Sequence, residues 1–260
     1  MGPKLTHPMD DSTRQRLNAI NRDFYTQHAG TFARTRNHPW PGWERALRAG
    51  PQEEPLRVLD VGCGNGRFGH FLAEQAGRRV AYTGVDLSPA LLEETREQTT
   101  ALFEVALEHA DWVREPPQQA LPKGPFGLVV AYGVLHHVPA HAKRKELLEV
   151  MGQRLSPGGI LVATFWRFGA PELATRYRHR LLSFAADKTS PAFIDPEQLE
   201  AGDCLLQWGD DPSAFRYCHY CDDAEIDALV GDLRLARVDS FVADGRSGDL
   251  NRYEILRRER

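Results

Sequence analysis

The residues of this chain with an evident chemical use lie in the stretch 56–71, LRVLDVGCGNGRFGHF. They are one carboxylate and three glycines at every second position: Asp60, Gly62, Gly64 and Gly66. Glycine has no Cβ and tolerates positive φ, so such a loop lets the backbone pass close to a ligand. The apolar run before the loop predicts a strand buried on both faces, and residues 67–76 predict a helix that Gly77 ends. A strand, a tight turn and a helix N-terminus together form a common site for nucleotide-like ligands.

The spacing of the glycines indicates which ligand. A dinucleotide fingerprint, G-x-G-x-x-G, has its third glycine where this chain has Arg67. The chain reads D-x-G-x-G-x-G instead, which resembles the cofactor motif of class I S-adenosylmethionine (SAM)-dependent methyltransferases, V-L-D-x-G-C-G-x-G. SAM carries a cationic sulfonium and no phosphate, so the carboxylate of Asp60 suits it and would repel a pyrophosphate. A tight turn without a ligand, and an NAD or FAD site, are the alternatives.

Two further carboxylates follow predicted strands. Asp86 ends the strand predicted over 79–85, where a doubly wound fold places the acceptor of the ribose hydroxyls. Residues 102–109 predict a third strand that leads to Asp111 and Trp112. In the resembling family these two residues flank the adenine, and the acid accepts from its exocyclic amine. The alternatives are that Asp86 is a plain acid at a helix entry and that Asp111 is an exposed loop acid.

The segment after the fourth predicted strand, residues 126–131, also resembles this class. It contains L-H-H-V, and the fifth strand, 160–165, follows the typical L-x-P-G-G-x-L pattern. The first histidine of such an element often packs under the cofactor, and catalysis by it is the alternative. Carried over by position, the resemblance implies a cofactor-binding set of Tyr25, Arg36, Asp60, Gly62, Cys63, Gly64, Asn65, Gly66, Asp86, Leu87, Asp111, Trp112, Tyr132 and His136.

Composition limits the class of protein. The 260 residues are 42% hydrophobic, enough for one α/β domain with a sizeable core. The net charge of −4 argues against a strongly basic nucleic-acid footprint, while leaving room for a local patch. No apolar run approaches the roughly 18 to 20 residues of a membrane span, and the N-terminus lacks the core of a signal peptide. Four cysteines suit a reducing compartment, so we expect a cytoplasmic protein with no membrane partner.

These elements predict an α/β fold with a Rossmann-like, seven-stranded and mostly parallel sheet. Helices cover both faces, the last strand is antiparallel, and an N-terminal helical lid is added. The final strands are expected over 235–243 and 252–257. The predicted divisions are a tail and lid over 1–50, the SAM-binding core over 51–166, a substrate-side insertion over 167–221, and a segment that completes the sheet over 222–260.

Three further segments narrow the resemblance to the eukaryotic tRNA wobble-uridine carboxymethyl methyltransferases. Residues 32–41 look like their F-x-x-T-R-x-x-P-W-P, residues 202–208 like G-D-x-x-V-P-W, and residues 215–220 like Y-R-Y-Y-H-x-F. That family esterifies a carboxymethyl group on tRNA, often with a small zinc-binding partner protein. The resemblance implies that Arg36 holds the SAM carboxylate and that three residues face the acceptor: Arg216, His219 and Arg252.

The chain departs from this pattern at two positions, where Cys218 replaces a tyrosine and Gln207 replaces a proline. A carboxylate acceptor is ionised at pH 7 and needs no general base, which agrees with the lack of an evident base or metal cluster. The alternatives are a small-molecule O- or N-methyltransferase of specialised metabolism and a non-catalytic SAM-binding subunit. One C-x-x-C, at 218–221, is too few ligands for a structural zinc site, so no metal is expected. The basic cluster at 176–180 is either a solvated helix face or a substrate patch.

Overall fold

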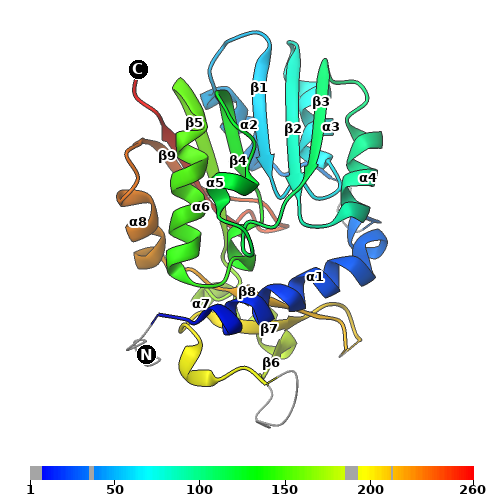
Figure 1. The fold of residues 1–260 in the computed structure, drawn as a ribbon, viewed down its shortest axis with the longest axis vertical. Coiled ribbons are helices and arrows are strands. Elements are labelled where there is room, and N and C mark those ends of the chain that lie inside the picture. The colour runs from blue at the N-terminus through cyan, green and yellow to red at the C-terminus, as the bar shows by residue number, and fades with distance from the viewer. Residues whose placement is uncertain (1–7, 35–37, 185–192, 212) are drawn as a thin grey trace.

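The computed structural model describes residues 8–34, 38–184, 193–211 and 213–260. In this part of the chain seven strands form the central sheet, in the order β3-β2-β1-β4-β5-β10-β9 (Figure 1). Their bounds are β1 Leu56–Val61, β2 Val80–Asp86, β3 Glu104–His109, β4 Phe126–Ala131, β5 Leu155–Trp166, β9 Ala236–Ala243 and β10 Asn251–Arg257. The first five pair in parallel, and β10 is antiparallel to both of its neighbours. The predicted fold class is confirmed.

Helices cover both faces of this sheet. One face packs against α2 Gly42–Ala49, α3 Arg67–Gln75 and α4 Pro89–Gln98, and the other against α5 Pro117–Ala120, α6 His141–Gln153 and α8 Asp223–Gly231. Strand β1 shows why both layers are needed. Leu56 and Val58 join the core on the first face, whereas Leu59 and Val61 join the core on the second. Successive side chains of a strand point to opposite faces, so an apolar run of this kind must be buried from both sides.

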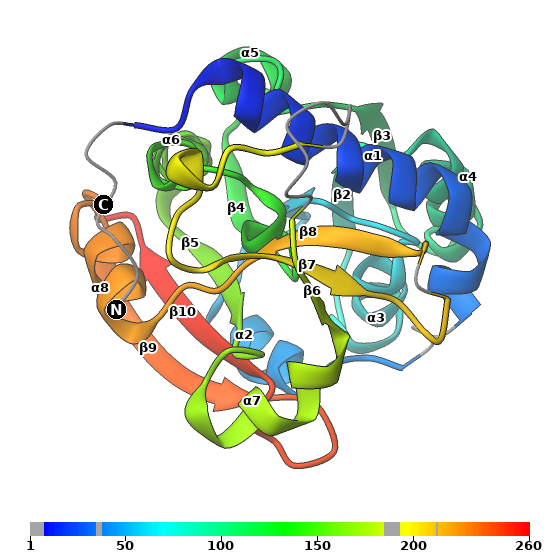
Figure 2. The same ribbon diagram turned by 90° about the horizontal axis from the view of Figure 1, so that it is seen from below.

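A second layer lies over the carboxyl ends of the parallel strands. It consists of the long helix α1, Asp11–Arg34, and a small antiparallel sheet of three described strands, β6 Leu181–Leu182, β7 Asp203–Gln207 and β8 Phe215–His219. Figure 2 shows α1 and β8 side by side below the central sheet, with α7, Pro171–Tyr177, beyond them. Leu17 of α1 is fully buried in a core shared with Leu205 and Tyr217 of the small sheet. Short 3₁₀ turns complete the chain at η1 Leu135–His137, η2 Arg178–Arg180 and η3 Pro196–Gln198.

The structure differs from the sequence-based expectation in two elements. Strand β5 begins at Leu155 rather than at 160, because Leu155 already pairs with Phe126 of β4, and after a register shift the pairing resumes at Ile160. The small sheet was not predicted, because its described strands are short and lie in a stretch with weak periodicity.

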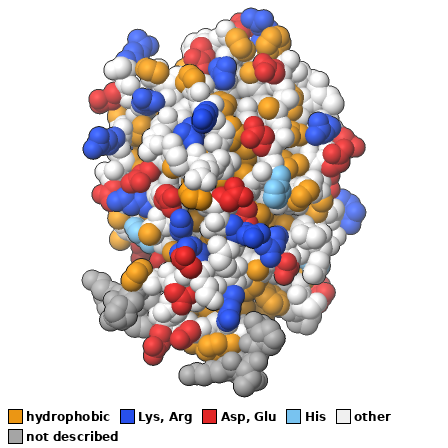
Figure 3. Space-filling model, in the orientation of Figure 1, with side chains coloured by type: hydrophobic (Ala, Val, Ile, Leu, Met, Phe, Trp, Pro, Cys, Tyr) orange, Lys and Arg blue, Asp and Glu red, His pale blue; other side chains and the backbone are white. Residues whose placement is uncertain are grey.

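One face of the molecule carries side chains of both charges, and Figure 3 shows these acidic and basic side chains interspersed over that whole face. Among the described helices, none has the length and apolar character that crossing a membrane requires.

Candidate functional site

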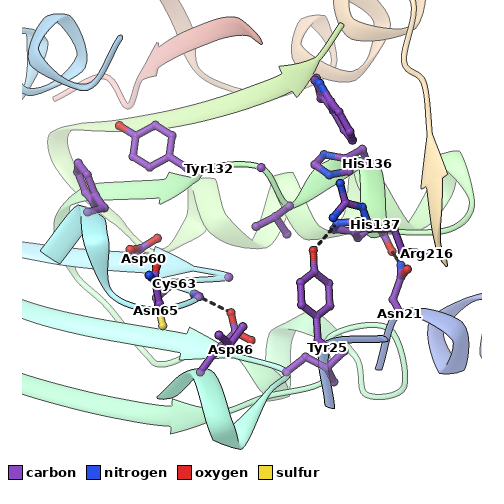
Figure 4. Close-up of a pocket in the computed structure, with 18 of the residues that line it drawn as sticks. Asn21, Tyr25, Asp60, Cys63, Asn65, Asp86, Tyr132, His136, His137 and Arg216 are labelled. Atoms are coloured by element: carbon purple, nitrogen blue, oxygen red, sulfur yellow. Dashed lines mark hydrogen bonds between the residues drawn. The ribbon is translucent and has the colours of Figure 1, made fainter. Parts of the chain in front are cut away.

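A cavity of about 250 Å³ lies between the carboxyl ends of the central strands, α1 and the small sheet. Its walls come from the loops after β1, β2, β3 and β4, from α1, and from β5 and β8. Figure 4 shows two groups of side chains along it. One end, here called the cofactor end, carries Asp60, Cys63, Asn65, Asp86 and Tyr132, and the other, the acceptor end, carries Asn21, Tyr25, His136, His137 and Arg216.

The glycine loop forms one wall of the cofactor end. Gly64 has φ +59°, in the left-handed region, and its backbone N–H donates to Oδ2 of Asp86 at 2.8 Å. A Cβ built on Gly64 would meet no protein atom within 4 Å, and this residue lines the cavity. The space beside the loop is therefore open to a ligand that approaches the backbone.

Burial shapes the chemistry of two carboxylates at this end. Asp60 is 2% exposed and accepts a hydrogen bond of 2.6 Å from the Tyr82 hydroxyl. Burial raises the pKa of Asp60 to about 7, against the opposing effect of Tyr82. Burial also raises the pKa of Asp86, whose Oδ1 accepts from the Ser88 N–H at 2.8 Å. A cationic or hydroxyl-rich ligand would favour the ionised form of both groups.

Asp111 links the central sheet to α1. Its two carboxylate oxygens each lie 3.0 Å from Nδ2 of Asn18, so that amide holds the helix over the cavity. Several cavity-lining polar atoms are buried and have no hydrogen-bond partner among the described residues: Tyr132 Oη, Trp43 Nε1 and Asn21 Oδ1. Carboxylates, unsatisfied polar atoms and an open glycine wall are a donor and acceptor set that fits SAM.

Most of the predicted cofactor residues line this one cavity: Tyr25, Asp60, Gly62, Cys63, Gly64, Asn65, Asp86, Leu87, Asp111, Trp112, Tyr132 and His136. Gly66 does not, because it begins α3 and a Cβ there would meet Thr95 of α4 at 2.7 Å. Arg36 lies outside the described residues. Asn18 and Asn21 were missed, although their helical spacing with Tyr25 places the three on one face of α1.

Arg216 is the charged group at the acceptor end. Its side chain is buried, with the residue 4% exposed, and its guanidinium carbon lies 5.1 Å from the ring centroid of Trp208 and 5.4 Å from that of Trp166. Its Nε and Nη1 have no hydrogen-bond partner in the part of the chain that the structure describes. A buried guanidinium with unsatisfied donors is costly unless an anion reaches it, so the site fits an anionic group.

The other two predicted acceptor residues are corrections. His219 does not line the cavity, because β8 turns it to the opposite face from Arg216. Its Nδ1 lies 2.7 Å from Asp203 and its Nε2 lies 2.8 Å from Glu225.

Arg252 also lies away from the cavity. It is engaged on the outer side of β10, where it forms ion pairs of 2.6 to 2.7 Å with Asp223, Asp227 and Glu254. Of the three residues expected to face the acceptor, Arg216 lines the cavity, whereas His219 and Arg252 are not among its lining residues.

The cysteines of the C-x-x-C do not converge as a zinc pair. Cys218 lies near His136 and His137, whereas Cys221 lies near His219 and Glu225, within distances that could hold a metal ion. In the second of these groups the buried Arg144 contacts Glu225 at 2.6 Å and His219 at 3.1 Å, so a guanidinium supplies positive charge there.

Comparison with known proteins agrees with this geometry. A family model described as a methyltransferase domain matches residues 59–161. Trans-aconitate 2-methyltransferase of Streptomyces coelicolor is 31% identical over 164 residues, which cover 63% of this chain and 48% of that protein. The tRNA (carboxymethyluridine(34)-5-O)-methyltransferase ALKBH8 of Mus musculus is 28% identical over 164 residues, 63% of this chain and 22% of that protein. The chain thus spans less than half the length of these relatives.

Solved structures show the same fold at low sequence identity. One is a complex between the Trm112 methyltransferase activator of Haloferax volcanii and a methyltransferase, with a TM-score of 0.63, 15% identity, and coverage of 92% of this chain and 97% of that one. Another is 1,6-didemethyltoxoflavin-N1-methyltransferase of Burkholderia thailandensis with S-adenosylhomocysteine bound, with a TM-score of 0.59, 17% identity, and coverage of 100% and 94%. The matched family model runs from β1 into β5 and includes the glycine loop that lines the cavity, and the solved methyltransferase structures share the fold around it.

Proposed function

We propose that the protein is a SAM-dependent methyltransferase that esterifies a carboxylate held by Arg216. The observation that carries this proposal is the buried guanidinium at the acceptor end, with two nitrogens that no described residue satisfies. A planar guanidinium matches a carboxylate with two parallel hydrogen bonds, which fixes both the position and the orientation of the acceptor.

The chemistry asks little more of the chain. SAM supplies an electrophilic methyl group, and a carboxylate is already a nucleophile at pH 7. The residues then have to align the acceptor oxygen and exclude water, which alone can supply a large part of the rate enhancement. Helix α1 lines one side of the cavity and helps to exclude water, while Trp166 and Trp208 provide apolar walls beside Arg216.

The acceptor that we propose is a carboxymethyl group on the wobble uridine of tRNA. The resemblance of residues 32–41, 202–208 and 215–220 supports it, and one relative is named for this reaction. Other relatives are named for trans-aconitate, which also carries carboxylates, so a small carboxylic acid is the second candidate. Arg180 reaches the cavity wall from a basic turn, which could contact a phosphate backbone. The same proposal places the protein in the reducing cytoplasm, which its cysteines favour.

A small activator protein is part of this proposal as well. It is supported by the resemblance and by a structural neighbour that was solved as a complex with the Trm112 activator. Turnover by the chain alone should then be low and should rise on addition of a Trm112-type protein. Equal turnover with and without it would remove the partner from the proposal.

The experiment uses radiolabelled SAM with tRNA that carries carboxymethyluridine, and in parallel with trans-aconitate. A methyl ester releases its label as methanol in mild alkali, and an ether or N-methyl product keeps it. Arg216→Ala and Arg216→Lys should lower kcat/KM on the order of 100-fold, because the acceptor is no longer aligned. SAM affinity should stay the same, and Arg252→Ala, an arginine outside the cavity, is the matched control.

Two results would overturn the proposal. A base-stable product would favour the small-molecule O- or N-methyltransferase. SAM binding without transfer to RNA or to carboxylic acids, with or without an activator, would favour a non-catalytic SAM-binding subunit.

A further inference from the structure

Two residues of the acceptor end form a hydrogen-bonded pair that carboxylate methylation does not use. Tyr25 comes from α1 and His137 ends the 3₁₀ turn η1, and both line the cavity. The Tyr25 hydroxyl lies 2.9 Å from Nε2 of His137, the bond drawn in Figure 4. The other ring nitrogen, Nδ1, lies 2.9 Å from the backbone carbonyl oxygen of Tyr217 in β8.

The carbonyl sets the direction of every proton in this pair. A carbonyl oxygen only accepts, so Nδ1 of His137 carries the hydrogen and donates to Tyr217. In the neutral imidazole Nε2 is then the acceptor, and the Tyr25 hydroxyl donates to it. The Tyr25 oxygen therefore holds its proton toward the histidine and can accept another from the side of the cavity.

The pair is held in place from both sides. Nδ2 of Asn21, one turn earlier on α1, donates to the backbone carbonyl of His137 at 3.3 Å. The Tyr25 and His137 rings meet edge to face at 5.5 Å. A base fixed in this way within hydrogen-bond reach of a bound acceptor is the arrangement that general base catalysis needs.

We propose that Tyr25 and His137 form a proton relay that lets this site also methylate hydroxyl groups that still carry a proton, in planar phenols above all. This inference rests on the proposed function, since it uses the same acceptor end and the same cofactor. The aromatic rings of Trp166, Trp208 and Phe24 around Arg216 suit a flat acceptor with an anionic group.

The step balances within these residues. As the acceptor oxygen forms its bond to the methyl carbon, its proton passes to the Tyr25 oxygen and the Tyr25 proton passes to Nε2 of His137. The electron pair of the broken carbon–sulfur bond stays on sulfur, which becomes neutral. The positive charge ends on His137, whose Nδ1–H remains bonded to the Tyr217 carbonyl. Solvent removes the extra proton after the product leaves.

The probe is 4-hydroxybenzoate, because it carries a carboxylate and a phenol on one ring. Incubation with radiolabelled SAM should give a base-labile methyl ester and a base-stable methyl ether. Tyr25→Phe keeps the ring and removes the relay, so the ratio of ether to ester should fall on the order of 100-fold or more. His137→Gln should have the same selective effect.

Controls separate the relay from a structural role. Tyr220→Phe changes a tyrosine outside the cavity and should leave the ratio of ether to ester unchanged. SAM affinity, measured by calorimetry, should be equal in the parent and in His137→Gln, which changes no residue of the predicted cofactor-binding set. Three results would each overturn the relay. The first is ester without ether, and the second is an unchanged ratio of ether to ester in Tyr25→Phe. The third is no product from 4-hydroxybenzoate in a preparation that methylates carboxymethyluridine tRNA. Ether without ester from any carboxylate would instead overturn the proposed function and leave the relay standing.

Discussion

Asp60 is a carboxylate that water hardly reaches, and its charge depends on what lies beside it. Burial raises its pKa to about 7, the Tyr82 hydroxyl lowers it, and the neighbouring Asp86 raises it. Because the folded-state pKa of Asp60 exceeds the ordinary value of 3.8, its contribution to stability is complete below about pH 4 and is lost as pH rises through 7. A bound cation offsets the free-energy cost of ionising this buried carboxylate, because it favours the charged form.

The first prediction follows from this linkage. SAM affinity should rise with pH by up to about tenfold per unit below pH 7, and should level off above it. Asp60→Asn removes the titrating group, so its SAM affinity should be lower at pH 7.5 and nearly independent of pH. Calorimetry between pH 5.5 and 7.5 measures this, below the pH of about 8 at which an α-amino group loses its proton. S-adenosylhomocysteine has a neutral sulfur and should show a shallower slope. Equal slopes in the parent and in Asp60→Asn would contradict the assignment.

At the scale of elements, the sequence predicts what local patterns determine. The glycine loop and its flanking strand and helix depend on neighbouring residues, and they appear within one residue of their expected bounds. The small sheet depends on pairing between short strands, and no local pattern announces it. Because strand β8 was not predicted, His219 was wrongly expected to share the side of Arg216. It lies three residues after Arg216, and once residues 215–219 are known to be a strand, the period of two puts the pair on opposite faces.

The glycine loop gives the second prediction. Gly64 and Gly77 have nearly the same backbone, with φ +59° and +63°, and a Cβ at either would meet no protein atom within 4 Å. Gly64→Ala and Gly77→Ala should therefore destabilise the fold by similar amounts, on the order of 1 to 2 kcal/mol. The cavity distinguishes them, because Gly64 lines it and Gly77 does not. SAM binding should weaken roughly 10- to 100-fold in Gly64→Ala, as an overpacked contact does, and stay unchanged in Gly77→Ala. Equal SAM affinity in the two variants would place the cofactor elsewhere.

At the scale of the whole molecule, the buried cation Arg144 joins the central sheet, which carries the predicted cofactor residues, to the small sheet, which carries Arg216. Arg144 of α6 is fully buried and reaches three elements: Glu200 before β7 at 2.5 Å, Glu225 of α8 at 2.6 Å and His219 of β8 at 3.1 Å. Although burial and the charge of Arg144 oppose it, hydrogen bonds that include those to Asp203 and Glu225 raise the pKa of His219 well above its ordinary value. The cluster thus fixes β8, the strand that carries Arg216.

The last prediction tests this connection between the two sheets by removing the charge of Arg144. Arg144→Met removes the arginine partner of two mostly buried carboxylates, Glu200 and Glu225, so the free energy of unfolding should fall by about 3 to 5 kcal/mol. Lys145→Met is the matched control one residue along the same helix. Its ion pair with Asp232 is largely exposed and should be worth no more than about 1 kcal/mol. Denaturant unfolding of the two variants measures the difference.

Measurements of local exchange and activity then distinguish a role of Arg144 in positioning β8 from a general loss of stability. At a temperature where Arg144→Met remains folded, β7 and β8 should exchange their amide hydrogens faster than the central sheet does. Transfer to the carboxylate should weaken through misplacement of Arg216, while SAM affinity changes little, since Arg144 lies outside the cavity. The cost of Arg144→Met should grow above the raised pKa of His219, because Arg144 then faces Glu200 and Glu225 without the opposing positive charge of that histidine. Uniformly faster exchange over both sheets, or parallel losses of SAM affinity and transfer, would show that Arg144 stabilises the fold without positioning the acceptor end.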